Sequence, residues 1–217
     1  MPKWNRNDLQ TGDLLLFHHE NDCKNCFNAV FSCFTGLIEC CTDSKFSHVA
    51  IVIRDPTFTD PPMKGLYVLE SSFETFRDAV DHKYKFGVEL EDYDKVINSA
   101  KQHETIYWRK LNCVRDATFY TLLNDVYNIV KDKPYDVFPK DWINALIHKK
   151  DASDGQVTSR FFCSALVAYV YFYWGFLPHT VEWTLVTPKM LSSEPNDNYK
   201  LQFKNCLIEW QNNLQIL

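Results

Sequence analysis

An uncharged stretch, residues 161–178, most constrains what this chain can fold into. A run of about 18 apolar residues is long enough to suggest a membrane-spanning helix. Gly175 and Pro178 interrupt the run, however, which leaves 163–174 as the expected helix. Twelve residues at ~1.5 Å each span ~18 Å, well short of the ~30 Å hydrocarbon core of a bilayer. The stretch therefore predicts a helix that is buried on most of its sides in a folded protein.

The composition agrees with a globular chain. Its 217 residues are 46% hydrophobic and 24% charged, and only 6 are glycine, which excludes collagen-like, linker-like and disordered classes. No shift in composition marks a boundary, so we expect a single domain over residues 1–217. The net charge of −5 provides no basic face, and we expect no nucleic acid partner.

The cysteines and the N-terminus indicate a reducing compartment. Eight cysteines in 217 residues are too few for a disulfide scaffold. The charged residues Lys3, Arg6 and Asp8 precede only a short apolar run, 14–17, which is not the pattern of a secretory signal peptide. We therefore expect reduced thiols and a cytoplasmic location, the host cytoplasm if the chain is viral.

Hydrophobic periodicity assigns most of the chain to strands or helices. Short β-branched and aromatic runs predict strands, mostly in the first half, whereas 116–131 repeats apolar residues at the spacing of an amphipathic helix. Because strands and helices do not alternate regularly, the pattern favours an α+β fold over a doubly wound sheet. The predicted strands are 14–17, 49–53, 66–70, 86–90, 105–111 and 199–203, and the predicted helices are 26–39, 116–131, 141–148, 163–174 and 188–191.

Three residues have positions that suit catalysis by a thiol. Cys163 opens the predicted buried helix, where unpaired N–H groups and the helix dipole favour a thiolate and an adjacent oxyanion. His48 begins a buried strand and is a candidate general base. Glu70 ends the next apolar strand and is a candidate for orienting the imidazole. Each also has a purely structural interpretation: a buried thiol, a rim histidine and a solvent-facing carboxylate.

Five motifs in a fixed order carry a resemblance to a known family. They are Leu-Gln-Thr-Gly-Asp-Leu-Leu-Leu-Phe (9–17), Phe-Ser-His-Val-Ala-Ile-Val-Ile (46–53), Val-Leu-Glu-Ser-Ser (68–72), Phe-Gly-Val-Glu-Leu (86–90) and Phe-Cys-Ser-Ala-Leu-Val-Ala-Tyr-Val (162–170). Together they resemble the circularly permuted branch of the NlpC-type papain-like superfamily, in particular its YiiX/YaeF-like group, which includes bacterial and poxvirus proteins. In that branch the histidine strand precedes the cysteine helix, as His48 precedes Cys163 here.

The resemblance implies a permuted papain-like α+β fold, with a mainly antiparallel sheet or barrel packed against helices. It implies a cysteine hydrolase or acyltransferase that acts on an amide, ester or thioester through an acyl-enzyme, without a metal or other cofactor. Cys163 would be the nucleophile, His48 the base and Glu70 the orienting acid. The turn at Asp13 would be structural.

The substrate side of the site is less constrained. The resemblance places Tyr135 before the cysteine helix, where it either lines the cleft or packs. Together with Ser47 and Ser164, which adjoin the base and the nucleophile, Tyr135 is a candidate substrate-binding residue. Insertions near 18–46 and 54–66 flank the His48 end of the cleft. A small molecule, a peptide or a lipid is therefore the expected substrate class, and contact with a membrane surface is compatible with it.

Two alternatives stay open from the sequence. The same fold is compatible with a non-catalytic module that binds a lipid or peptide in the cleft, and the apolar face of helix 26–39 suits either an acyl chain or the core. A zinc-stabilised domain would use Cys23, Cys26, Cys40 and Cys41. Adjacent cysteines are a poor ligand pair, however, and Cys26, Cys33 and Cys40 fall at near-helical spacing, which favours small apolar packing residues.

Overall fold

The computed structural model describes residues 5–19, 45–72, 76–101, 104–136, 158–193, 201, 203 and 214–216. These residues form an α+β structure, as the sequence pattern predicts. Its elements in chain order are η1 (Arg6–Asp8), β1 (Leu14–His19), β2 (His48–Arg54), β3 (Leu66–Ser72), β4 (Gly87–Asp92), α2 (Tyr93–Ala100), β5 (Glu104–Arg109), α3 (Ala117–Val130), α5 (Cys163–Tyr173), η3 (Trp183–Leu185), α6 (Pro188–Leu191) and β6 (Leu214–Ile216).

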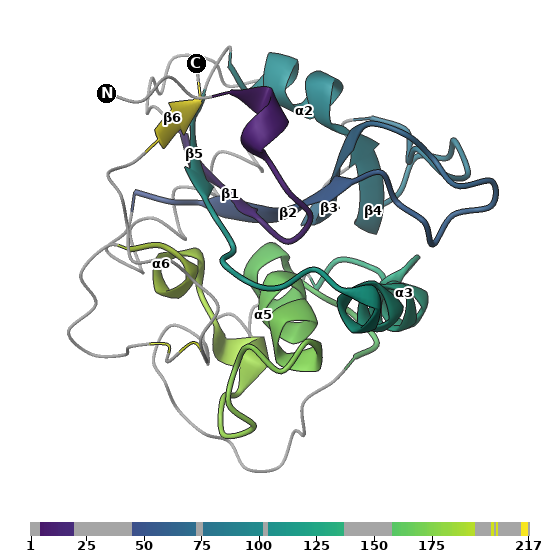
Figure 1. Ribbon diagram of the computed structural model, residues 1–217. Coiled ribbons are helices and arrows are strands. Elements are labelled where there is room, and N and C mark those ends of the chain that lie inside the picture. The colour runs from purple at the N-terminus through teal and green to yellow at the C-terminus, as the bar shows by residue number, and fades with distance from the viewer. Residues whose placement is uncertain are drawn as a thin grey trace.

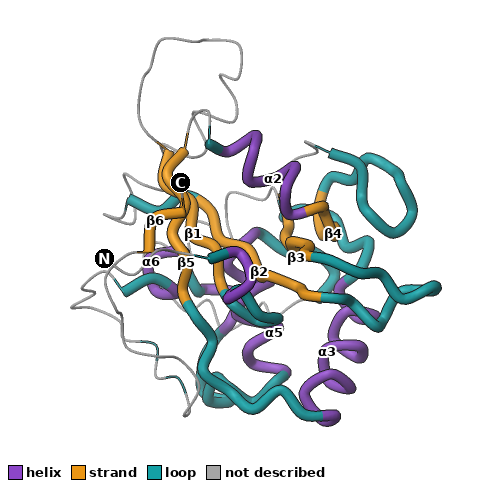
Figure 2. The backbone as a smooth tube through the Cα atoms, turned by 45° about the horizontal axis from the view of Figure 1, so that its top comes forward, coloured by secondary structure: helices purple, strands orange, loops and turns teal. Residues whose placement is uncertain are grey.

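The strands form one antiparallel sheet in the order β4–β3–β2–β1–β5–β6. The views in Figures 1 and 2 show this sheet running through the middle of the molecule. The five strands predicted between 14 and 111 are confirmed, with ends that differ by a few residues. Antiparallel pairing brings the start of β2 beside the end of β3, and the end of β3 beside the start of β4. These three strand termini therefore lie together at one end of the strands.

Helices cover both faces of the sheet. In Figure 1, α2 lies on one face, and α3, α5 and α6 lie on the other. Side chains alternate along each strand, so each face has its own apolar core. Leu14, Leu16, Val49, Ile51 and Leu69 join the core on the α5 side, and Leu15, Phe17, Ala50, Val52 and Val68 join the core on the α2 side.

The uncharged stretch folds as a central helix. Helix α5 ends at Tyr173, and every residue from Cys163 to Tyr171 is buried, which confirms the predicted helix and its burial. It packs against β2, β3 and α3, so apolar residues suit all of its sides. Among the residues that the structure describes, no helix has the length and apolar character needed to span a membrane.

Caps explain where the other helices begin. The Asp116 side chain accepts a hydrogen bond from the Phe119 amide at the start of α3, and Asp92 accepts from the Lys95 amide at the start of α2. Helix α2 is not among the predicted helices, because it is short and follows β4 without a turn: Asp92 both ends the strand and caps the helix.

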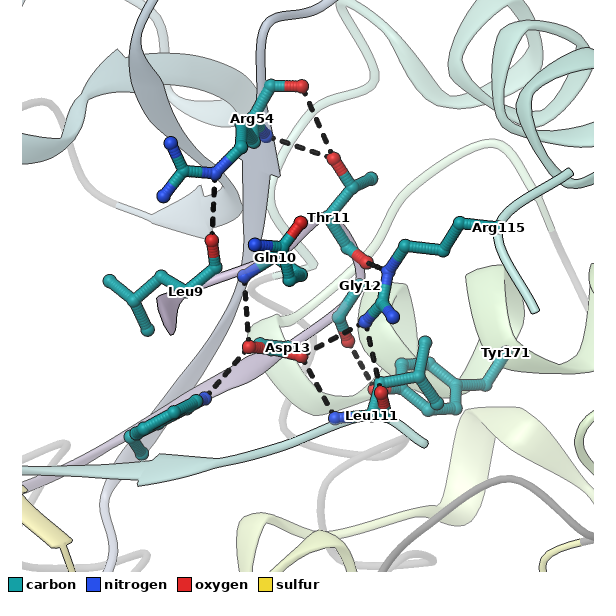
Figure 3. Close-up of polar contacts among 10 residues, drawn as sticks. Leu9, Gln10, Thr11, Gly12, Asp13, Arg54, Leu111, Arg115 and Tyr171 are labelled. Carbon is teal, nitrogen blue, oxygen red and sulfur yellow. Dashed lines mark hydrogen bonds and ion pairs between the residues drawn. The ribbon is translucent and has the colours of Figure 1, made fainter. Parts of the chain in front are cut away.

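A buried network ties the loop before β1 to α5 and to the segment between β5 and α3 (Figure 3). The Asp13 carboxylate accepts hydrogen bonds from the Gln10 amide, the Trp108 indole, the Leu111 amide and the Arg115 guanidinium at 2.9–3.1 Å. The Tyr171 hydroxyl of α5 donates to the Gly12 carbonyl at 2.5 Å. These contacts hold the C-terminal half of α5 against the sheet, in accordance with a structural role for Asp13.

Some predictions fall outside the described residues. These are helix 26–39 with its cysteines, helix 141–148, and most of strand 199–203. Leu201 and Phe203, the two described residues of that last segment, are not in a strand, so the strand prediction is wrong for them. The Phe203 ring instead packs against the Arg109 guanidinium and the Tyr171 ring, which favours side-chain burial over strand pairing.

Candidate active site

The start of α5 is bound to the end of β3. The Ser71 hydroxyl donates to the Phe161 carbonyl at 2.7 Å, and both groups are buried. The same carbonyl accepts a hydrogen bond from the Asp136 amide at 3.0 Å, and the Phe161 amide donates to the Pro134 carbonyl at 3.1 Å. These contacts between distant segments place Cys163, two positions after Phe161, at the end of the sheet where β2 begins.

His48 and Glu70 meet at this end of the sheet. His48 is the first residue of β2, and Glu70 lies near the end of the neighbouring β3. The His48 Nε2 donates to Glu70 Oε2 at 2.5 Å. The Glu70 side chain is 5% exposed and that of His48 is 19% exposed, so the pair is largely desolvated but reaches the surface through the imidazole. The sequence prediction that these residues lie on adjacent strands is confirmed.

Cys163 is the second partner of His48. A side-chain hydrogen bond and a charge interaction join the two groups. Burial, the largest influence, lowers the pKa of His48, but the contributions of Cys163 and Glu70 together raise that pKa well above its ordinary value. The imidazole therefore carries a proton at neutral pH and is held against the Glu70 carboxylate.

Glu70 is the complementary charge. Burial alone would raise the pKa of Glu70, but the hydrogen bond and positive charge of His48, together with a hydrogen bond to Glu91, hold it below its ordinary value. A buried carboxylate stays ionised only with such partners. The arrangement is thus a buried ion pair, His48 with Glu70, with the Cys163 thiol on the other side of the ring.

The N-terminus of α5 places its first-turn amide groups next to the thiol. Phe162 occupies the cap position and makes no side-chain capping hydrogen bond. The first-turn N–H groups, which begin at Cys163, have no partner within the helix. Such amides, together with the positive end of the helix dipole, attract an anion.

The structure brings Tyr135 to the same place. Tyr135 pairs with Phe161 through a parallel bridge, and its side chain is buried. Burial first, and then the negative charges of Cys163 and Asp136, raise the pKa of Tyr135 well above its ordinary value, so its hydroxyl keeps its proton. Tyr135 thus lies within electrostatic range of the thiol, in addition to packing 5.7 Å from the Phe86 ring.

Ser47 and Ser164 are buried beside the base and the nucleophile. The Ser164 hydroxyl donates to the Val186 carbonyl at 2.6 Å, which fixes the first turn of α5 against the segment after η3. The Ser47 hydroxyl and amide both point to the Phe17 carbonyl, at 3.5 and 3.0 Å. In this structure both serines support the neighbouring catalytic candidates through main-chain contacts.

Two further acids lie beside Glu70 that the sequence interpretation did not single out. Glu89 and Glu91 on β4 are each 2% exposed. Glu89 lies directly opposite Glu70, and Glu91 lies opposite Val68. A signal was present in the sequence: acids at alternate positions of an otherwise apolar strand point to one face of a sheet. Only the strand pairing reveals that this face is the one that carries Glu70.

The described residues contain no group of three or more histidine, cysteine or acidic side chains arranged to hold a metal ion. Cys23, Cys26, Cys40 and Cys41, the candidate zinc ligands, lie outside the described residues.

Comparisons with known proteins give one weak structural match. No model of a known protein family matches the chain, and no curated protein matches it. Among solved structures, the chain is similar to metalloprotein yiiX from Escherichia coli O157:H7, with 18% identity and a TM-score of 0.43. The match covers 75% of this chain and 64% of that one, so it spans less than two thirds of the yiiX chain. The permuted papain-like fold stays a prediction.

Proposed function

We propose that this protein is a cysteine hydrolase or acyltransferase that forms an acyl-enzyme on Cys163. The observation that carries the proposal is the placement of His48, which is hydrogen-bonded to Glu70 on one side and to Cys163 on the other. A nucleophile, a base and an orienting acid in that order form the arrangement that activates a nucleophilic thiol.

In the first step the Cys163 thiolate attacks the carbonyl carbon of an amide, ester or thioester, and a C–S bond forms. Because His48 Nε2 is hydrogen-bonded to Glu70, Nδ1 is the ring nitrogen that remains for proton transfer at Cys163 and the substrate. The protonated His48 gives its proton to the leaving amine, alcohol or thiol as the bond from the carbonyl carbon to that group breaks. Neutral His48 then removes a proton from water or another acceptor, which attacks the acyl-enzyme and expels the thiolate.

The first-turn amides of α5 support the negative oxygen that develops in both steps. They are uncapped, fixed by the helix and adjacent to the sulfur, which are the conditions under which backbone donors stabilise an oxyanion. Tyr135 adds a protonated hydroxyl on the same side, as a candidate contact for the substrate. The substrate class, whether a small molecule, a peptide or a lipid, is left open by these residues.

The proposal is tested with p-nitrophenyl acetate, a simple acyl donor. We expect a burst of p-nitrophenolate and an acetyl group on Cys163, located by peptide mapping. Cys163→Ala abolishes both, and His48→Ala slows acetylation by about 10²–10⁴-fold, the usual contribution of a positioned acid–base group.

The matched control is Cys113, the other described free thiol. Burial raises the pKa of Cys113, so we expect little acetylation there in any variant. If Cys163 reacts no faster than Cys113, or if His48→Ala leaves its rate unchanged, the catalytic proposal is wrong and the binding-module alternative is favoured.

A further inference from the structure

Three carboxyl groups share one buried face of β3 and β4. The register places Glu70 opposite Glu89, and Val68 opposite Glu91, so all three glutamates point to the face that α2 covers. Their side chains lie next to one another, and each residue is 4% exposed or less. Three ionised carboxylates at such a site would repel one another strongly, so the group must distribute its protons unequally.

The contacts assign a different role to each acid. Glu70 is bonded to His48 and is the ionised member. Burial, and then the charge of Glu70 and a hydrogen bond to it, raise the pKa of Glu91 to about 10, with a smaller contribution from the charge of Glu89. Glu91 therefore holds a proton at neutral pH, and in its hydrogen bond with Glu70 it is the donor.

The position of Glu91 is fixed from its other side. Its Oε1 accepts the Phe76 amide at 3.0 Å, which occupies that oxygen as an acceptor and assigns the proton of the acid to Oε2. A carboxylic acid held in this way offers one donor in one direction. Glu89 differs: the Ser72 hydroxyl donates to its Oε1 at 2.9 Å, its Oε2 has no hydrogen-bond partner among the described residues, and it acts on Glu70 through charge.

We propose that Glu91 is a positioning residue, whose carboxylic acid group donates a hydrogen bond to Glu70 and thereby holds the Glu70 carboxylate against His48. The result is a continuous line of contacts from Glu91 through Glu70 and His48 to Cys163. This inference rests on the proposed function, because it assigns a purpose to Glu70 in orienting His48. Glu91 itself touches neither the thiol nor the substrate.

The proposal predicts what happens when the donor is removed. Glu91→Met keeps an unbranched side chain in the apolar site but donates nothing to Glu70. Without that donor, buried Glu70 either takes up a proton or turns away, and both changes weaken its attraction for His48. Glu91→Gln retains a donor for Glu70 and an acceptor for the Phe76 amide. The matched control is Glu89→Gln, which removes an equally buried acid of the same face that does not donate to Glu70.

The experiment measures the pKa of His48 by NMR titration of its imidazole, together with the rate of Cys163 acetylation by p-nitrophenyl acetate across pH. In Glu91→Met we expect the pKa of His48 to fall by ~1 unit and acetylation to slow ~10-fold, since one pKa unit is a factor of ten. Glu91→Gln and Glu89→Gln should stay within about twofold of the wild type in rate and keep the pKa of His48. Wild-type values for His48 and for the rate in Glu91→Met overturn the proposal, as does an equal loss in Glu91→Met and Glu91→Gln.

A second measurement covers the case in which Glu91→Met does not fold. The infrared spectrum of the wild type at neutral pH should contain C=O stretching intensity from buried protonated carboxyl groups, of which the Glu91 contribution disappears in Glu91→Gln and the Glu89 contribution disappears in Glu89→Gln. If Glu91→Gln leaves this intensity unchanged, Glu91 is ionised and cannot be the donor, and the proposal fails. The two proposals also fail separately: a wild type that is not acetylated while Glu91→Met still lowers the pKa of His48 contradicts catalysis and supports the positioning contact.

Discussion

At the scale of single residues, the environment decides what each acid does. Glu70 and Glu91 are the same residue type on the same face of the sheet, but Glu70 lies against His48 and stays ionised, whereas Glu91 lies against Glu70 and stays protonated. Pairs of titratable groups whose pKa values are driven apart are typical of sites that perform acid–base chemistry.

Asp13 illustrates a buried charge with a structural purpose. Asp13→Ala leaves the Arg115 guanidinium without its carboxylate and three other donors without their acceptor. We expect a loss of about 3–5 kcal/mol in the free energy of unfolding, the usual effect of breaking a buried ion pair. Urea denaturation measures it. Exposed Asp8 in η1 is the matched control, and Asp8→Ala should change stability by less than ~0.5 kcal/mol. Equal effects of the two substitutions would show that the network around Asp13 is not what stabilises the loop.

The sequence points to the three central residues of the candidate site because each stands at the end of a clear apolar element. Cys163 opens an uncharged helix, and His48 and Glu70 terminate β-branched strands, so their positions follow from periodicity and from the family-like motifs. Glu89 and Glu91 could not be assigned in this way. Their role depends on the register of β4 against β3, a long-range property that local pattern does not contain.

At the scale of elements, the strands and the two longer described helices are predictable because each buries a continuous apolar face. Helix α2 is not, because its apolar residues Tyr93, Val96 and Ile97 make only two turns directly after a strand. The β4 strand also depends on one glycine that local pattern does not explain. Gly87 has φ of +147° and begins the strand beside the segment that leads to Tyr135.

Gly87→Ala should destabilise this junction. A Cβ at position 87 would lie 2.1 Å from the Lys133 carbonyl oxygen and 2.7 Å from the Pro134 Cα, both main-chain atoms. The main chain must shift to relieve that contact, and the change adds backbone strain, so we expect a loss of more than ~2 kcal/mol in the free energy of unfolding. Thermal denaturation with tryptophan fluorescence detects it.

Gly175→Ala is the control for backbone strain alone. Gly175 also has positive φ, +77°, but a Cβ there meets no atom within 4 Å. We expect a cost of about 1 kcal/mol from the left-handed backbone without a clash. If the two substitutions have the same effect, close approach of the Lys133 carbonyl is not what requires a glycine at position 87.

At the scale of the whole molecule, the buried site should make stability depend on pH. Burial first, and then the charge of Glu70, raise the pKa of Glu89 to about 8 and that of Glu91 to about 10, against an ordinary value near 4.5. Between pH 5 and 8 the native state therefore holds protons that the unfolded state has released, and stability falls as pH rises. The raised pKa of His48 acts in the same direction, because its contribution is complete below about pH 6.5 and is lost as pH rises through the native value.

Glu70 determines how the stability of the fold falls at acid pH. Its native pKa is lowered, so its contribution is present above pH 4.5 and is lost as pH falls through the native value. Urea midpoints measured from pH 3 to 9 should therefore be highest near pH 5, and the decline toward pH 8 should be smaller in the double variant with Glu89→Gln and Glu91→Gln. A stability that rises from pH 5 to 8 would contradict the assignment of protons to Glu89 and Glu91.

The whole-molecule architecture is predictable in class but not in detail. An α+β fold with His48 and Glu70 on adjacent strands follows from the sequence, whereas the six-strand order and the docking of α5 through Ser71 and Phe161 depend on contacts between residues about 90 positions apart. That docking is what places the thiol beside the imidazole.

The most direct test of the central claim, that Cys163, His48 and Glu70 act as one unit, is the rate of alkylation of Cys163 by iodoacetamide at pH 7. Peptide mapping follows Cys163 and Cys113 in the same sample. The account predicts that Cys163 reacts at least ~10-fold faster than Cys113, and that His48→Ala slows Cys163 by ~10-fold or more while Cys113 keeps its rate. Glu70→Gln should give an intermediate rate. Equal rates for the two thiols in the wild type, or a Cys163 rate that does not respond to His48→Ala, would contradict it.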